Sequence, residues 1–446
     1  SQTMMNDGGL AVVRMKPLGA GGGGGERSSA SGAPSGVTFS APKAEVTVDG
    51  RLFSYPSHVI APEMDQQALY DAFMPVNMQA FVDGVNVNVI AYGQTGSGKT
   101  HTVFGPPGIL ARAAAGELGD GVDQDYGLFP RGVLGAVDTV GKLRQEGIAA
   151  VLTASAVELS IMGNEDMLAR SETAVRRAAN DGAGTSQWSS AALGVALDKA
   201  SDPPRLCGMT ELPLDSPADV RLLCGALATR NTAGTLMNNT SSRSHCFAFL
   251  TLRVLKDEAG VARVRTSRFQ FVDLAGSERL KDAHGASVSW KEGGEALNGM
   301  LTNYSLTMLS ACVRGLVEAK RKRAKFSFRA FLSDLVDLLQ ESMTGDAATA
   351  CFVCLSQAPT NLVQSKFALD FGEVFAQLSA PRPRATKPVP LALLAKQTNA
   401  TLGEARRALQ GSKSGGRCRP VREAQVRDCE QRLRLLNRLG SRLSRD

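Results

Sequence analysis

From about Val37 to Leu378, the chain alternates short apolar runs with stretches whose apolar residues recur at helical spacing. The apolar runs have the length of strands and are bounded by polar or glycine-rich residues. They are VNVNVIAY at 85–92, AAVLTASAVEL at 149–159, CFAFLTLRVL at 246–255, RFQFVDL at 268–274 and ATACFVCLSQA at 348–358. A further strand-like run, LAVVRMKPL at 10–18, precedes this region. This alternation predicts an α/β domain built around a central sheet.

Changes in composition set the predicted boundaries of this domain. We expect residues 1–9 to be a flexible N-terminus, and residues 10–378 to form one large domain. Within it, the Gly/Ser-rich segment 19–36 has almost no apolar surface to bury and is predicted as a flexible insert. Residues 169–204, rich in Ala, Gly, Ser and Asp, predict a loop insertion.

The C-terminal part of the chain is rich in proline at its start and basic throughout. Residues 379–391 are predicted as a linker that contains Pro381, Pro383, Pro388 and Pro390. From Pro381 onward there are 16 Lys and Arg against 5 Asp and Glu, whereas the net charge of the whole chain is only +7. Residues 392–446 are therefore predicted as a basic tail, with apolar residues at heptad spacing near its end: Val426, Cys429, Leu433, Leu436 and Leu443. A homodimer through this short helix is one alternative, and contact of the tail with nucleic acid or membrane is another, although no specific nucleic-acid partner is predicted.

Composition excludes several classes of protein. With 446 residues, 43% hydrophobic and 21% charged, the chain is not disordered throughout. No apolar run reaches the roughly 18 residues that cross a bilayer, so we expect no transmembrane segment, and the N-terminus lacks a secretory signal pattern. Eight scattered cysteines fit a reducing compartment. Cys351 and Cys354 have redox-like spacing, but on a strand they face opposite sides, which favours a role in the core.

The run at 85–92 leads directly into a glycine-rich motif of the form G-x-x-x-x-G-K-[ST]. Its glycines let the backbone curl so that successive N–H groups face phosphate oxygens, while the lysine adds a positive charge and the last hydroxyl can bind Mg²⁺. The motif consists of Gly93, Gln94, Thr95, Gly96, Ser97, Gly98, Lys99 and Thr100. A Gly/Ser turn between two elements is the alternative, but a strand before the motif and a helix after it favour a nucleotide site.

Two polar clusters are candidates for sensing a terminal phosphate. One runs from Asn238 to His245, just before the strand at 246–255, and the other runs from Asp273 to Arg279, at the end of the strand at 268–274. Both adjoin strand ends, where ligands of open α/β sheets bind. Asp273 could hold Mg²⁺ through water and Gly276 could offer its N–H to the phosphate. Each cluster alone could equally be an ordinary polar loop.

Taken together, the three motifs resemble the motor domain of the kinesin superfamily. YGQTGSGKTHT is similar to its P-loop, NNTSSRSH to its switch I and DLAGSE to its switch II, in the same order. Arg14, Lys16 and Pro17 resemble the motif that flanks adenine, and His101 lies where kinesins place a stacking side chain. GLFPR at 127–131 is similar to the GIIPR element, and NYSL at 303–306 resembles the NKSL of the relay helix. The resemblance implies an α/β P-loop fold. Its central sheet would have eight strands, mostly parallel, with helices on both faces.

The resemblance also implies a role for each motif residue in the hydrolysis of Mg-ATP. Lys99 and Thr100 would hold the β- and γ-phosphates and Mg²⁺, and Ser242 and Asp273 would complete the metal shell. Ser241 would orient the attacking water, and Gly276 would contact the γ-phosphate. Arg243 and Glu278 would form the ion pair that closes the site. Loss of the γ-phosphate contacts would then tilt the switch II helix.

The same resemblance implies that the partner is the microtubule, in the cytoplasm and on the cytoskeleton, with spindle and cilium or flagellum as further expectations. Because tubulin presents an acidic surface, five cations at the end of the relay helix are predicted to face it: Lys320, Arg321, Lys322, Arg323 and Lys325. A solvated helix end or a nuclear-localisation run is the alternative.

Two departures from the family pattern bear on movement. Asp334 and Asp337 stand where the family usually has cations at its track surface. The four prolines of the linker cannot donate to a strand ladder, so we expect the linker to dock incompletely. A microtubule-dependent motor is therefore the first prediction, and a weakly hydrolysing or non-motile scaffold of the same fold is the alternative.

Overall fold

The computed structural model describes residues 10–16, 36–55, 58–160, 163–170, 194–232, 244–278, 295–378, 383–411 and 419–443. The predicted N-terminus at 1–9 and all of the Gly/Ser-rich insert except Gly36 lie outside these ranges. Among the described helices, none combines the length and the apolar character needed to span a bilayer.

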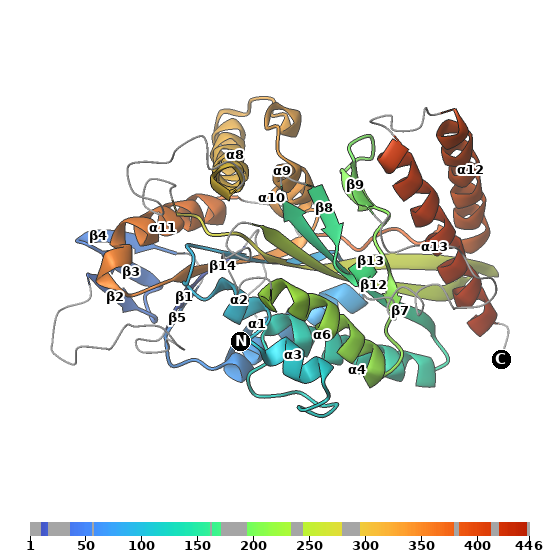
Figure 1. Ribbon diagram of the computed structural model, residues 1–446, viewed down its shortest axis with the longest axis horizontal. Coiled ribbons are helices and arrows are strands. Elements are labelled where there is room, and N and C mark those ends of the chain that lie inside the picture. Colours follow the sequence, from blue (N-terminus) through green and yellow to red (C-terminus); the bar gives the residue numbers. More distant parts are fainter. Residues whose placement is uncertain are drawn as a thin grey trace.

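A large mixed sheet forms the centre of the molecule (Figure 1). Its strands lie in the order β10 (Arg205–Cys207), β9 (Gly194–Asp198), β8 (Gly163–Asp166), β7 (Ala149–Ser160), β12 (His245–Glu258), β13 (Val261–Asp273), β6 (Val87–Tyr92), β14 (Ala348–Leu355), β1 (Leu10–Met15) and β5 (His58–Ile60). Two further strands, β11 (Leu212–Pro213) and β15 (Val389–Pro390), pair with β7 and β13. The predicted fold class is confirmed, and short strands raise the strand count from the expected eight to twelve.

Pairing is parallel on one side of β13 and antiparallel on the other. β13, β6, β14, β1 and β5 form parallel pairs, whereas β7, β8, β9, β10, β12 and β13 are joined by antiparallel pairs. The parallel strands carry continuous apolar runs because both of their faces are covered. All six residues of β6 are buried. This strand therefore places the glycine-rich motif at its carboxyl end, between two parallel neighbours.

Two hydrophobic clusters cover the two faces of the sheet (Figure 1). One face is packed by α1 (Gln66–Val82), α2 (Lys99–Val103), α3 (Ile109–Ala114), α4 (Leu128–Gln145) and α6 (Pro217–Thr232). The other is packed by α8 (Glu295–Lys322), α9 (Asp334–Leu338), α10 (Gln340–Thr344) and α11 (Leu362–Ala376). Cys354 belongs to the first cluster and Cys351 to the second, which confirms that the two thiols are core residues on opposite faces.

A small second sheet extends the molecule beside α11. It consists of β2 (Val37–Ser40), β3 (Glu45–Val48) and β4 (Arg51–Ser54), paired in that order. Short single-turn segments at Leu168–Arg170, Phe328–Ala330 and Pro359–Asn361 complete the described elements. Arg51 reaches Asp370 at 2.5 Å, and Lys366 reaches Asp49 at 2.6 Å. These ion pairs fasten the small sheet to the helix that follows β14.

The predicted loop insertion at 169–204 contains regular structure at its end. β9 pairs with β8, and β10 pairs with β9, so residues 194–207 form a hairpin at one edge of the main sheet. Residues 171–193 lie outside the described ranges. The sequence did not predict this hairpin because its strands contain only short apolar stretches within a segment rich in Ala, Gly and Ser.

The segment predicted as a basic tail packs against the domain instead of leaving it. α12 (Leu391–Gln410) and α13 (Arg419–Leu443) form a hairpin beside β7 and β12 (Figure 1). Leu435, Leu436 and Leu439 are buried with apolar residues of these strands and β13. Each buried leucine contributes roughly 1.5–3 kcal/mol. Cys429 and Leu436 of the predicted coiled-coil seam are therefore buried within the chain, whereas Val426 and Leu433 are half-buried.

Candidate nucleotide site

The glycine-rich motif forms a loop between β6 and α2 whose shape depends on its glycines. Gly93, Gly96 and Gly98 have φ values of 146°, 77° and 100°, a region that side chains with a Cβ rarely adopt. A Cβ on Gly93 would also lie 2.3 Å from the carbonyl oxygen of Cys354. The Lys99 ammonium donates to the Gln94 carbonyl at 2.7 Å. The loop is thus curled around its own lysine, which lies within it.

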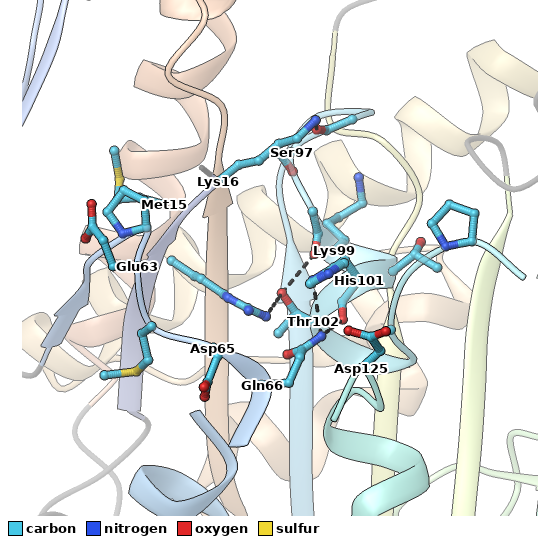
Figure 2. Close-up of a pocket in the computed structure, with 18 of the residues that line it drawn as sticks. Met15, Lys16, Glu63, Asp65, Gln66, Ser97, Lys99, His101, Thr102 and Asp125 are labelled. Atoms are coloured by element: carbon cyan, nitrogen blue, oxygen red, sulfur yellow. Dashed lines mark hydrogen bonds between the residues drawn. The ribbon is translucent and has the colours of Figure 1, made fainter. Parts of the chain in front are cut away.

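A cavity of about 660 Å³ opens over this loop (Figure 2). One wall is the motif itself, and the other walls come from the end of β1, the start of α1 and the loop before α4. The lining includes Arg14, Met15, Lys16, Pro62, Glu63, Met64, Asp65, Gln66, Gly96, Ser97, Gly98, Lys99, Thr100, His101, Gln124 and Asp125. The volume and the mixture of apolar and polar groups suit a nucleotide-sized ligand.

The cations predicted to flank the base reach the glycine-rich motif and the helix α2 that follows it. Arg14 donates from Nη1 to Thr102 Oγ1 at 2.9 Å, and Lys16 donates from Nζ to the Gly96 carbonyl at 3.1 Å. Burial lowers the pKa of the Arg14 guanidinium. Both side chains project from the end of β1, which the sheet places beside β14 and close to the loop. Pro17 lies outside the described residues.

His101 is held in place by the first residue of α1 (Figure 2). The Gln66 amide nitrogen donates to the His101 carbonyl at 2.6 Å and lies 3.1 Å from His101 Nδ1. This contact assigns Nδ1 as an acceptor, so the proton of the neutral ring is on Nε2. Burial, with the nearby Arg14 charge, lowers the pKa of His101. The ring is therefore neutral near pH 7 and lines the wall of the cavity, as a stacking role requires.

Two of the predicted metal ligands, Thr100 in the cavity wall and Asp273 behind it, are joined by a hydrogen bond. Thr100 donates from Oγ1 to Asp273 Oδ2 at 2.7 Å, and the Asp273 side chain is buried at the end of β13. A hydroxyl and a carboxylate are oxygen donors of the kind that Mg²⁺ binds together with phosphate. The donor set therefore fits Mg²⁺. Ser242, the third predicted ligand, lies outside the described residues, as do Asn238, Ser241 and Arg243.

The second polar cluster lies directly on the phosphate loop. Glu278 accepts the Thr95 main-chain N–H at 2.8 Å and also the Thr95 hydroxyl. The Ser277 N–H donates to the Gly93 carbonyl at 3.1 Å. A Cβ on Gly276 would lie 2.3 Å from Thr95 Oγ1 and 2.4 Å from Glu278 Oε2, so a side chain there would displace one of these groups. Residues 273–278 thus contact the loop that would hold the phosphates, whereas the roles predicted for Gly276 at the γ-phosphate and for Glu278 in an ion pair with Arg243 stay predictions.

The described end of the first cluster joins the second cluster to α8. The Ala275 N–H donates to His245 Nδ1 at 3.1 Å, which leaves the proton on Nε2 to be donated to Ser305 Oγ at 2.8 Å. Ser244 donates to Glu158 Oε1 at 2.5 Å. His245 therefore connects the loop at 273–278 with the long helix, a contact that the sequence did not predict.

Arg131, within the GLFPR segment, is a further residue whose role the sequence did not reveal. Its Nε donates to the Tyr126 carbonyl at 2.8 Å, and Nη2 donates to the carbonyls of Asp123 and Gln124 at 3.0 and 2.9 Å. Nη1 contacts the Gln67 amide oxygen. Burial lowers the pKa of this guanidinium. The arginine pins the loop that carries Gln124 and Asp125 into the cavity wall.

Comparison with known proteins places this geometry in a family. The model of the kinesin motor domain matches residues 40–378. The chain belongs to the kinesin motor domain family. This kinesin motor domain is 29% identical over 331 residues to the kinesin-like protein KIN-1 of Arabidopsis thaliana, which covers 74% of this chain and 62% of that protein. It is 28% identical over 366 residues to the kinesin-like protein klp-12 of Caenorhabditis elegans, covering 77% and 21% of the two chains.

The solved structure of a fast kinesin has the same fold, with a TM-score of 0.61 and 24% identity. The similarity covers 85% of this chain and 93% of that one. The chain spans less than two thirds of the two curated relatives, so their whole-protein activities are not carried over. The resemblance inferred from the three motifs is confirmed at the level of the family.

In this kinesin motor domain, the predicted track surface has partly compensated charges. Arg321 and Lys322 both reach Glu318 Oε1 at 2.9 Å. Lys199, in the turn between β9 and β10, lies 2.8 Å from Asp334 and 3.4 Å from Asp337. Burial raises the pKa of Asp337. The two acids that depart from the family pattern are thus partnered by a cation from the predicted insertion.

Proposed function

We propose that this kinesin motor domain hydrolyses Mg-ATP with water and that microtubule binding stimulates the reaction. The contact between Glu278 and Thr95 carries this proposal. Thr95 belongs to the loop that would surround the terminal phosphate, and Glu278 belongs to the loop that connects to α8 through Ala275 and His245. A change at the phosphate therefore has a short route of hydrogen bonds to the long helix.

The residues of the site have distinct tasks in this reaction. Lys99 and the curled main chain of residues 93–100 bind the phosphates, and Thr100 with Asp273 holds Mg²⁺, which neutralises the charge that develops during phosphoryl transfer. Ser242 is expected to complete the metal shell and Ser241 to orient water. Gly276 offers a main-chain N–H close to the loop. Arg14, Lys16 and His101 support the base end of the cavity.

Glu278 is expected to exchange partners during the cycle. Here it binds Thr95, whereas the closed site is expected to pair it with Arg243. A terminal phosphate that takes the Thr95 N–H would release the carboxylate for this ion pair. Closure of the site is then coupled to the presence of the third phosphate, which is the property that an ATP-driven switch needs.

A non-motile microtubule-binding scaffold with low turnover is the second candidate. It is favoured by Asp334 and Asp337, which add negative charge at the predicted track surface and are only partly offset by Lys199. In either case the proposed partner is the microtubule, and the proposed location is the cytoskeleton of the cytoplasm, including the spindle and the cilium or flagellum.

Steady-state ATPase measurements with and without microtubules test the proposal and separate the two candidates. We expect strong stimulation in the wild type. Glu278→Ala should still bind a fluorescent ATP analogue but lose stimulated turnover by about 100-fold, equivalent to about 3 kcal/mol of transition-state stabilisation. Glu404→Ala, an exposed glutamate on α12, is the matched control and should retain full turnover. Unstimulated wild-type turnover would favour the scaffold, and normal turnover in Glu278→Ala would remove that residue's role.

A further inference from the structure

The linker of this chain is attached to the central sheet despite its prolines. The Thr386 N–H donates to the Gly84 carbonyl at 2.9 Å, and the Thr386 hydroxyl donates to the Thr266 carbonyl at 2.6 Å. Val389 and Pro390 form β15, which pairs with Val264 and Arg263 of β13. Through these contacts the described part of the linker lies along β13 and beside Gly84.

The helical hairpin begins where the linker ends. α12 starts at Leu391, directly after Pro390, so no spacer separates docked strand from helix. Leu391 and Leu394 pack on the apolar cluster that contains Val264, the residue of β13 that pairs with Val389. The linker and the hairpin therefore share one point of attachment on the sheet.

The second helix is fixed to the core at two polar sites. The side-chain amide of the buried Gln431 accepts the Glu211 N–H at 2.9 Å and donates to the Met209 carbonyl at 2.7 Å. It thus bonds to the main chain at 209–211 in the way that the main chain of a neighbouring strand would. Near the end of α13, Arg438 contacts Asp215, and Arg442 lies 3.4 Å from it.

Asp215 also binds Arg144 of α4 at 2.9 Å. Burial alone would raise the pKa of this carboxyl, but Arg438 and the other two arginines hold it below its usual value. The carboxylate therefore stays charged at neutral pH and ties α13 to α4.

We propose that the α12–α13 hairpin is a clamp that keeps residues 383–390 docked on β13 in every nucleotide state. Freeing the linker requires Val389 to leave β13 and Leu391 to leave the cluster that α13 shares. A nucleotide can drive that opening only through its differential affinity for the open and closed forms. Conformational changes at the nucleotide site are then transmitted through α8, while residues 383–390 stay docked on β13. The proposal rests on the proposed function only for the identity of the nucleotide states.

Distance measurements between two spin labels test the clamp. One label is placed at Ala385→Cys in the linker and the other at Gln79→Cys in α1, both exposed positions. The seven described cysteines are buried, and Cys418 is replaced by serine so that it does not compete. In the full chain we expect one short distance without nucleotide, with ADP and with a non-hydrolysable ATP analogue.

Two aspartate substitutions on α13 provide the comparison. Leu439→Asp places a charge in the buried cluster and should release the hairpin, which broadens the distance distribution by about 15 Å, the spread of a free segment of this length. Asn437→Asp introduces the same charge at an exposed position and should leave the distribution unchanged. Gln431→Leu is a milder second variant, expected to give a mixture of the docked and released distances.

Each result decides one part of the proposal. A wild-type distance that lengthens in one nucleotide state overturns the clamp. A docked linker in both Leu439→Asp and Gln431→Leu shows that the hairpin is not what holds it. Failure of the wild type to bind the ATP analogue contradicts the proposed function instead, and the comparison of variants without nucleotide still tests the clamp.

Discussion

Arg131 shows how a single buried side chain can shape the base end of the nucleotide cavity. Its described hydrogen bonds go to three main-chain carbonyls and the Gln67 side chain, and these acceptors belong to the loop and the helix that form one wall. Gln66, the neighbour of Gln67, holds His101. The planar guanidinium can reach acceptors in several directions at once, which an ammonium on a flexible stem cannot do.

Arg131→Lys should therefore weaken binding of the base without disturbing the phosphate loop. We expect the KM for ATP to rise about tenfold, which is about 1.4 kcal/mol, while kcat stays within about twofold. Titration with inorganic tripolyphosphate should give the same affinity in both proteins, because it contacts only the loop at 93–100. Arg112→Lys on α3 is the control, since Arg112 is exposed and pairs with Glu117. Equal losses for ATP and tripolyphosphate would show that Arg131 acts on the whole fold.

The residues of the site differ in how far the sequence predicted them. The P-loop, Asp273, Gly276 and Glu278 belong to contiguous motifs whose spacing specifies local geometry, and the structure brings their described members together. Gln66 and Arg131 were not assigned roles because their contacts join segments that are distant in the chain. A polar residue at the start of a helix, such as Gln66, can have several structural roles. Only its position in the folded protein shows which of them it has.

Among the elements, β8 and the turn after it contain a buried carboxyl that makes stability depend on pH. Asp166 accepts the N–H groups of Leu168, Ala169 and Thr210 at 3.0, 3.3 and 2.6 Å. Burial raises its pKa to about 6, and these hydrogen bonds oppose the rise without cancelling it. Because the folded pKa lies above the unfolded one, the folded state binds more protons between pH 4 and 6.

The free energy of unfolding contributed by Asp166 should fall as pH rises through this window, by on the order of 3 kcal/mol in total. The side chain in Asp166→Asn cannot titrate. The free energy of unfolding of the wild type should therefore increase relative to that of the variant as pH falls from 7 to 4. Urea denaturation at four pH values measures this difference. A difference that is independent of pH would mean that folding does not raise the pKa of Asp166.

The C-terminal elements were predicted poorly for an identifiable reason. α13 carries seven arginines among its 25 residues, a charge density that is typical of a solvated helix. Leu435, Leu436 and Leu439 nevertheless pack on residues of β7, β12 and β13. Gln431 and Arg438 add polar contacts that hydropathy does not register. The glycine-rich break and the linker prolines strengthened the expectation of a separate tail. The position of α13 is set by its tertiary packing on the sheet. The sequence of α13 alone does not show which surface of the domain it packs against.

For the whole molecule, this docking changes where positive charge is available. The net charge of +7 is concentrated after Pro381, but Arg438 and Arg442 are bound to Asp215, and Arg406 pairs with Glu430 inside the hairpin. Arginines that pair within the fold contribute little to long-range attraction of an acidic surface. The electrostatic attraction of the predicted track surface to an acidic partner therefore has to come from the cations at the end of α8. These five cations are not equivalent.

Arg323 and Lys325 have no ion pair within the described part of the chain, whereas Arg321 and Lys322 share Glu318. Arg323→Gln with Lys325→Gln should weaken microtubule binding at low salt by about tenfold, mainly through slower association. Arg321→Gln with Lys322→Gln removes the same formal charge but also frees Glu318, so its effect reports whether the local pairs matter.

If attraction depends on uncompensated charge, removing Arg321 and Lys322 leaves Glu318 unneutralised and should weaken binding at least as much as the first double variant. A triple variant that adds Glu318→Gln should recover part of this loss, because it removes one negative charge from the same surface. Cosedimentation at three salt concentrations measures all three proteins against the wild type. The differences should shrink as salt screens exposed charges. Equal binding in every variant at low salt would show that this basic run does not face the microtubule.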